Sequence, residues 1–261
     1  MLFETSENYV RKLVADGLRI DRRGFEDFRE IKVETGVAPK AEGSARVTIG
    51  NTQVLAGVKM SLGDPYPDTP NEGVLIVNTE LVPIASPTFE PGPPDENAIE
   101  ISRVVDRGIR ESKCIELEGL GVGEKVWIIN VDIHVLDHDG NLIDASAIGA
   151  ISALLDAKIP KYDESEEKIL YGEPDRPLPV RDIPVAVTSG KISGRILLDT
   201  TLEEESALDA RLTVTTNKNG EIVAMQKGGS GFFTFEEVER AVELSVEKGK
   251  EIRKILGGIR D

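Results

Sequence analysis

Three arginines on one predicted helix have the residue type and spacing for binding phosphate groups. Arg103, Arg107 and Arg110 follow one another at intervals of four and three residues within 96–114. At about 100° per residue they cluster on one side of a helix, while apolar residues occupy the opposite side. The planar guanidinium group donates hydrogen bonds in a geometry that suits phosphate oxygens. This face is therefore a candidate anion-binding surface.

A solvated helix face is the alternative for the same arginines. Glu100 precedes Arg103 by three residues and Asp106 precedes Arg110 by four, so ordinary ion pairs within the helix are available. Arg107 has Arg103 four residues before it and no acidic residue three or four positions before it. We therefore regard Arg107 as the best anion-binding candidate of the three.

The segment Asp137–Ser146, DHDGNLIDAS, combines the backbone of an anion site with the wrong charge. It follows an apolar run and leads into a helical pattern, and the free N–H groups and dipole of a helix N-terminus favour anions. However, it carries Asp137, Asp139 and Asp144, and no lysine or arginine occurs within it. We expect Asp144 to be the N-cap and to accept hydrogen bonds from some of the free N–H groups itself. The carboxylates would repel an incoming phosphate.

Two further sets of side chains are weaker candidates for chemistry. The acids Asp199, Glu203–Glu205 and Asp209 could hold Mg²⁺ or act as general acids, but such a run is more typical of a solvated helix turn. His134 and His138 lie at the end of one predicted strand, without a cysteine or a recognisable nucleophilic serine beside them. Structural roles are favoured for both histidines, and we predict neither a metal site nor a cofactor.

Composition limits the classes of function. The 261 residues carry a net charge of −16, which repels nucleic acid over most of the surface. Any contact with a polyanion must therefore be local, or must depend on a more basic partner. Cys114 is the single cysteine, which excludes an internal disulfide. No apolar run reaches the roughly 20 residues of a membrane span, and the N-terminus lacks the apolar core of a signal peptide. We expect a cytoplasmic protein that does not bind membranes.

The pattern of apolar residues predicts strands followed by helices in each half of the chain. Hairpins are expected where Gly50-Asn51-Thr52 and Asn219-Gly220 separate alternating runs. This order favours an α+β fold with mixed sheets and helices on one side. Helices are expected over residues 3–15, 96–114, 144–157 and 235–256. We divide the chain into an N-terminal helix and lead-in (1–30), a first half (31–160), a connector (161–184) and a second half (185–261).

Several segments, in their order and spacing, resemble the RNase PH family of phosphorolytic exoribonucleases over roughly residues 17–248. They are GLRIDRRGFEDFREIKVETG, GSARVTIGNTQVLAGV, EISRVVDRGIRESK and WIINVDIHVLDHDGNLIDASAIGAISALLDAKIP. Within the family, the chain is similar to the non-catalytic one of the two RNase PH-type subunits of the archaeal exosome. The resemblance implies an RNase PH-like fold, with two βαβ-rich halves similar to ribosomal protein S5 domain 2.

The resemblance also implies a reaction, in which inorganic phosphate attacks the terminal phosphodiester at an RNA 3′ end and releases a nucleoside diphosphate. Catalytic members carry Gly-Ser-Arg or Gly-Thr-Arg before the buried helix, and the arginine binds the phosphate. The matching positions here are Gly140-Asn141-Leu142, and leucine can neither donate a hydrogen bond nor carry charge. The family's acidic catalytic residue falls near Asp209. The chain therefore resembles a subunit that has no catalytic residues of its own and assists RNA degradation without cleaving.

The implied partners are a catalytic RNase PH-like subunit, RNA-binding cap subunits and single-stranded RNA. The catalytic subunit would alternate with this chain in a hexameric ring of three heterodimers. The family helix that faces the RNA path matches EISRVVDRGIR, so the resemblance implies RNA-backbone contacts for Arg103, Arg107 and, less directly, Arg110. Two alternatives remain: an autonomous phosphorolytic exoribonuclease that uses Asp209 and Arg107, and a scaffold that never touches RNA.

Overall fold

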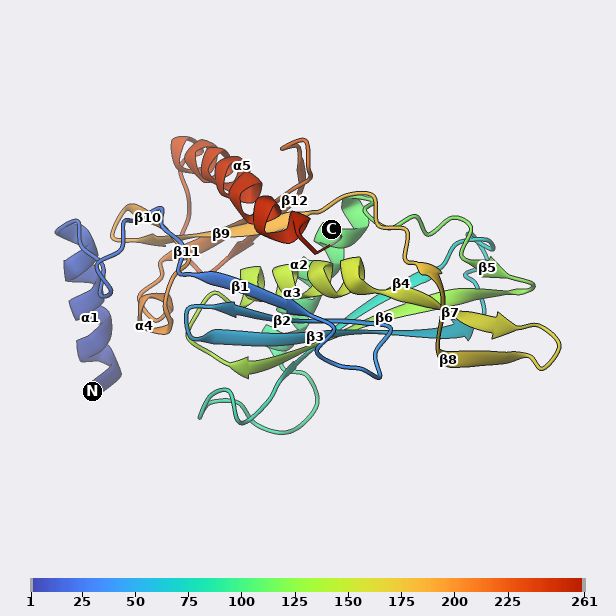
Figure 1. Ribbon diagram of the computed structural model, residues 1–261. Coiled ribbons are helices and arrows are strands. Elements are labelled where there is room, and N and C mark those ends of the chain that lie inside the picture. Colours follow the sequence, from blue (N-terminus) through green and yellow to red (C-terminus); the bar gives the residue numbers. More distant parts are fainter. Residues whose placement is uncertain (1, 260–261) are drawn as a thin grey trace.

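The first sheet of the computed structural model, which describes residues 2–259, carries most of the hydrophobic core (Figure 1). Its strand order is β1-β2-β3-β6-β4, and β5 pairs with β6 at one end. Only β4 and β6 run parallel among its described pairs, because α2 lies between them in the chain. The strands are β1 (Ile31–Thr35), β2 (Gly43–Ile49), β3 (Thr52–Gly63), β4 (Val74–Leu81), β5 (Gly121–Val122) and β6 (Lys125–Asp137).

The second sheet is antiparallel throughout, in the order β10-β9-β11-β12. A separate two-stranded hairpin, β7 with β8, projects beyond the end of the first sheet (Figure 1). Most of the predicted connector, 161–184, belongs to this hairpin. The strands are β7 (Lys158–Asp163), β8 (Lys168–Pro177), β9 (Val185–Ile192), β10 (Arg195–Leu198), β11 (Ala210–Thr216) and β12 (Ile222–Gly228).

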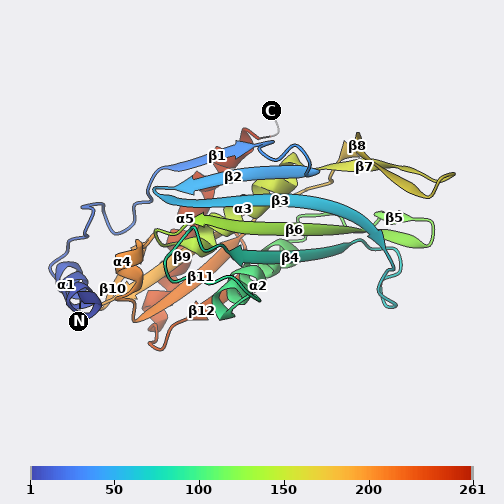
Figure 2. The same cartoon turned by 90° about the horizontal axis from the view of Figure 1, so that it is seen from below.

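The helices fill the space between the sheets and cover the second one. α3 packs against β2 and β3 on one side and β9 on the other, while α5 covers the far face of the second sheet (Figure 1). α2 lies beside β4 and β12 (Figure 2). No helix in the described part of the chain is long and apolar enough to cross a membrane. The helices are α1 (Leu2–Ala15), α2 (Glu96–Glu111), α3 (Leu142–Asp156), α4 (Leu202–Glu205) and α5 (Phe235–Gly257).

The sequence of α3 reflects its place between two sheets. Nearly all of its residues are buried, including the small residues Ala145, Gly149 and Ala153. A helix that is buried on every side needs apolar residues all round, and small ones allow sheets to approach from two directions. The position of α3 matters for function because its N-terminus lies at the junction of the two halves.

The α+β class and both hairpins are confirmed. Ile49 pairs with Thr52, so Gly50 and Asn51 form the turn between β2 and β3. Gly50 has a φ of +58°, which favours glycine because it has no side chain to clash. The second turn, around Gly220, joins β11 to β12.

A buried ion pair joins the N-terminal lead-in to the second half. The Arg19 guanidinium donates to both carboxylate oxygens of Glu204, at 2.9 Å and 2.6 Å, and both side chains are fully buried. The same guanidinium donates to the carbonyl oxygens of Leu198 and Asp199. Because burying a charge is tolerated only when it is paired, this contact fixes the loop that leads into α4. That loop lies against the start of α3.

Candidate functional site

The turn before α3 leads into the helix without a side-chain cap. Asn141 is the N-cap residue, with a φ of 55°, and its side chain makes no capping hydrogen bond. The expectation that Asp144 is the N-cap is wrong. Asp144 lies within the first turn of the helix, where its carboxylate accepts from the backbone N–H and the hydroxyl of Thr188 at 3.0 Å and 2.7 Å. Because Thr188 on β9 supplies two donors, the Asp144 carboxylate bonds to β9 and does not cap the helix.

The place where a phosphate would meet this helix is taken by a carboxylate of the protein itself. The backbone N–H of Asn141 donates to Oε1 of Glu205 at 2.7 Å, and its side-chain amide donates to Oδ1 of Asp199 at 2.9 Å. A helix N-terminus binds anions through such free N–H groups. Here a carboxyl group of the protein, that of Glu205 on α4, occupies that position. The charge repulsion expected from Asp137, Asp139 and Asp144 stays a prediction.

The backbone of the second half, at Thr200 and Thr201, packs directly against Gly140 in this turn. Gly140 has a φ of +85°, and a Cβ atom at this position would lie 2.3 Å from the carbonyl oxygen of Thr200 and 2.6 Å from the carbonyl carbon of Thr201. The Thr52 hydroxyl donates to the Gly140 carbonyl oxygen at 2.6 Å from the other side. Glycine is therefore required here by both conformation and space. The turn is packed as interior structure.

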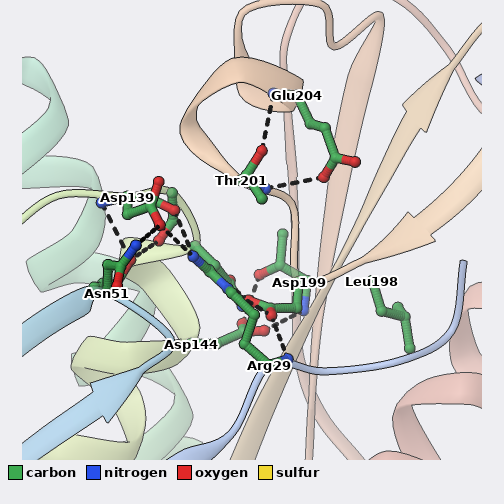
Figure 3. Close-up of polar contacts among 12 residues, drawn as sticks. Arg29, Asn51, Asp139, Asp144, Leu198, Asp199, Thr201 and Glu204 are labelled. Atoms are coloured by element: carbon green, nitrogen blue, oxygen red, sulfur yellow. Dashed lines mark hydrogen bonds and ion pairs between the residues drawn. The ribbon is translucent and has the colours of Figure 1, made fainter. Parts of the chain in front are cut away.

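The cations near this turn are consumed by internal ion pairs (Figure 3). Asp199 is fully buried, and its carboxylate accepts from Arg29 Nη2 at 2.7 Å, from Arg29 Nε at 2.9 Å and from Arg23 Nη1 at 2.8 Å. Burial alone would raise the pKa of Asp199, but its hydrogen bonds and ion pair with Arg29 outweigh burial and hold the pKa below its usual value. Arg29 also donates to the backbone oxygen of Asp139 at 2.6 Å.

Two other carboxyl groups at this turn have pKa values raised to about 7. Burial raises the pKa of Asp144 to about 7, against the opposing effect of its hydrogen bonds from Thr188. Burial likewise raises the pKa of Glu205 to about 7, although the hydrogen bond from Asn141 favours the charged form. Near pH 7 these groups are therefore in exchange between a neutral acid and a carboxylate.

Two of the three helix arginines are available to an external ligand. Arg103 is exposed and makes no hydrogen bond or ion pair within the described part of the chain. Arg107 is exposed and has a long contact, 3.4 Å, from Nη1 to Oε1 of Gln226 on β12. Arg110 is engaged, since it pairs with Asp106 at 2.8 Å and donates to the backbone oxygen of Leu75 at 3.1 Å.

The alternative of ordinary ion pairs within the helix thus applies to Arg110 and fails for Arg103. Glu100, the acid expected to pair with Arg103, instead forms an ion pair with Arg211 of β11. Glu100 and Arg211 also line a cavity that reaches Asn141 and Glu205. The exposed face of α2 and the filled helix N-terminus therefore belong to one region of the surface.

The acidic run that was a candidate for metal binding or acid catalysis is dispersed. Asp209 accepts from Arg11 Nη1 at 2.6 Å and from the backbone N–H of Ser193 at 3.0 Å, and it does not line the cavity. Glu203 is exposed, and Glu204 pairs with Arg19. Within residues 2–259, no group of His, Cys, Asp and Glu side chains is placed to hold a metal ion.

The two histidines have separate surroundings. Nδ1 of His134 lies 3.1 Å from Oε2 of Glu80 on the neighbouring strand β4. The ring of His138 stacks on that of Phe89, with centroids 5.3 Å apart and planes 12° from parallel. Sequence reasoning did not find this stack, or the roles of Arg29 and Glu205. The partners are too far apart in the chain for a spacing rule to connect them.

Comparison with known families covers both halves of the chain. Residues 27–160 match domain 1 of the 3′ exoribonuclease family, RNase PH, and residues 182–248 match its domain 2. A curated relative, the exosome complex component Rrp42 of Pyrococcus furiosus, is 55% identical over 253 residues. That alignment covers 95% of this chain and 91% of the relative.

Solved structures have the same fold over almost the whole chain. One chain in the Archaeoglobus fulgidus exosome with RNA bound to the active site is 51% identical, with a TM-score of 0.90, covering 97% of this chain and 98% of that one. A chain of an archaeal exosome core is 46% identical, with a TM-score of 0.86, covering 100% of this chain and 98% of that one. The predicted fold is therefore confirmed.

The raised pKa of Glu205 predicts a specific dependence of stability on pH. The carboxyl holds its proton in the folded state to about pH 7 but loses it near pH 4.5 when unfolded. The folded state therefore binds more protons in this window, and the free energy of unfolding falls as pH rises through it. A Glu205→Gln variant cannot ionise at this position. As pH rises between these values, its free energy of unfolding should fall by about 2 kcal/mol less than that of the unmodified chain.

Chemical denaturation across this pH range measures the effect, and Glu203→Gln is the matched control because Glu203 is an exposed acid on the same short helix. Glu203→Gln should follow the unmodified chain. An identical pH dependence for Glu205→Gln and the unmodified chain would show that Glu205 is not held in a desolvated position.

Proposed function

Because the chain belongs to the RNase PH family of 3′ exoribonucleases, we propose that it is the non-catalytic ring subunit of an archaeal exosome core. In this role it helps to bind RNA and to shape the active site of a catalytic RNase PH-like partner. The reaction of the complex is 3′-to-5′ phosphorolytic degradation of RNA. The near-complete coverage of exosome components by the alignments supports this assignment.

The filled helix N-terminus is the observation that supports a non-catalytic role. Phosphorolysis requires a bound inorganic phosphate and cations that offset the charge on the reacting phosphoryl group. At the family's phosphate position this chain places Leu142, while the Glu205 carboxylate takes the N–H of Asn141. Two arginines near this position are already paired, Arg29 with Asp199 and Arg211 with Glu100.

Arg103 and Arg107 are the residues that we assign to RNA binding. Both are exposed on α2 and lack an acidic partner among the described residues, so their guanidinium groups are free to contact phosphates. We rank Arg110 below them because it must release Asp106 and the Leu75 carbonyl before it can bind. The resemblance implied the same ranking, while spacing alone favoured Arg107.

The partners follow from the same assignment. A catalytic subunit would alternate with this chain in a ring of three heterodimers, and cap subunits would add RNA-binding surface. With a net charge of −16 on this chain, most of the positive potential along the RNA path must come from those partners. A cytoplasmic location fits this role and remains a prediction.

A phosphorolysis assay tests the non-catalytic role. Purified chain alone, given single-stranded RNA and inorganic phosphate, should release no nucleoside diphosphate. The same chain assembled with a catalytic RNase PH-like subunit should release it steadily. Robust release by the chain alone, abolished by Asp209→Asn, would instead establish the alternative of an autonomous phosphorolytic exoribonuclease.

RNA crosslinking to the assembled complex tests the arginine assignment. An Arg103→Glu/Arg107→Glu variant should lower crosslinking to this subunit and reduce the salt dependence of RNA binding, by a slope of about 0.7 for each lost phosphate contact. Arg195→Glu is the control, because Arg195 is exposed on β10, at the opposite edge of the second sheet from β12. Equal crosslinking in both variants would favour a scaffold that does not touch RNA.

A further inference from the structure

The cavity beside the filled helix N-terminus has features that the proposed function does not use. Its volume is about 220 Å³, and its walls come from the loop after β4, from α2, from the start of α3, from α4 and from β11. This space is large enough to admit a single planar ring.

One wall of the cavity is aromatic. Phe89 and His138 both line it, and their rings are stacked with an interplanar angle of 12°. The backbone N–H of Gly140 donates to Nδ1 of His138 at 3.3 Å, so the neutral imidazole carries its proton on Nε2. Burial lowers the pKa of His138, although Asp139 and Asp137 oppose this effect. The wall is therefore an uncharged stacking surface with one N–H donor.

The remaining walls carry hydrogen-bonding groups of both kinds. Oε1 of Glu205 is occupied by Asn141, but Oε2 accepts no hydrogen bond from any described residue and is free to accept one. Arg211 and Asn97 supply N–H donors, and Glu100 pairs with Arg211. The cavity thus suits a flat, uncharged ring that has donors and acceptors along its edge.

We propose that this cavity takes a single nucleobase of the RNA strand, with its face on the Phe89–His138 stack and its edge toward Glu205 and Arg211. Protein sites for single-stranded RNA combine such stacking with contacts to the base edge. Cytosine fits the groups present, since its amino group can donate to Glu205 while its carbonyl oxygen accepts from Arg211. The base enters without its phosphate, which stays outside.

The position of the cavity connects it to the proposed RNA path, and the inference depends on the proposed function for the source of the base. Glu100 lines the cavity, and Arg103 lies three residues further along the same helix, a rise of about 4.5 Å. A strand whose phosphates contact Arg103 and Arg107 therefore passes next to the opening. One base can leave the strand there and enter.

Proton NMR of the histidine rings tests the proposal on the full chain. The sequence has two histidines, of which His138 lines the cavity and His134 does not, so His134 is an internal reference. Cytidine, which carries no phosphate, should shift the His138 ring signals in a saturable manner and leave those of His134 unchanged. Ribose without a base should shift neither. The proposal is overturned if cytidine leaves His138 unmoved at millimolar concentration, or if ribose moves it equally.

A pair of matched variants identifies the binding surface. Phe89→Leu keeps an apolar side chain but removes the stacking ring, and it should weaken cytidine binding by about fivefold or more. Phe232→Leu is the control, because Phe232 is 75% exposed and does not line the cavity. It should bind cytidine as the unmodified chain does. Equal affinity in Phe89→Leu and Phe232→Leu would overturn the proposal.

The Arg103→Glu/Arg107→Glu variant separates this inference from the proposed function. Neither arginine lines the cavity, so the variant should respond to cytidine as the unmodified chain does. If cytidine binding fails in every form of the chain while the arginine variant still loses RNA crosslinking, the proposed function stands and the base site is wrong.

Discussion

The buried carboxylate of Asp199 is the charge around which the two halves of this protein are assembled. It lies in the second half, yet it accepts hydrogen bonds from Arg23 and Arg29 of the N-terminal lead-in and from Asn141 at the start of α3. A buried charge is stable only while its partners remain in place, so these segments cannot move independently. This network also holds Arg23 and Arg29 in internal ion pairs.

The same packing fills a turn that has the backbone shape of an anion site. The turn at Gly140 and the start of α3 keep the shape of an anion site, but Glu205 completes the hydrogen bonding and the backbone at Thr200 covers the glycine. The Glu205 carboxyl thus accepts from the N–H of Asn141, to which an external anion could otherwise bind.

The sequence predicted the elements well because their signals are local. The apolar arc of α2 and the turns at Gly50 and Gly220 depend on residues within a few positions of one another, and all are present in the structure. The site was predicted less completely. Asp144 was expected to cap α3, but Thr188 on a distant strand attracts it, and the pairing of Glu100 with Arg211 spans 111 residues. Such contacts are decided by tertiary packing, which spacing along the chain does not contain.

The central claim is that the N-terminus of α3 is occupied from within and does not bind inorganic phosphate. Titrating phosphate into the isotope-labelled chain, while following the backbone amide NMR signals of Gly140, Asn141 and Leu142, measures this directly. We predict that these signals do not move at any phosphate concentration that leaves the rest of the spectrum unchanged. A saturable shift confined to these three amides would show that phosphate displaces Glu205, and it would contradict the account.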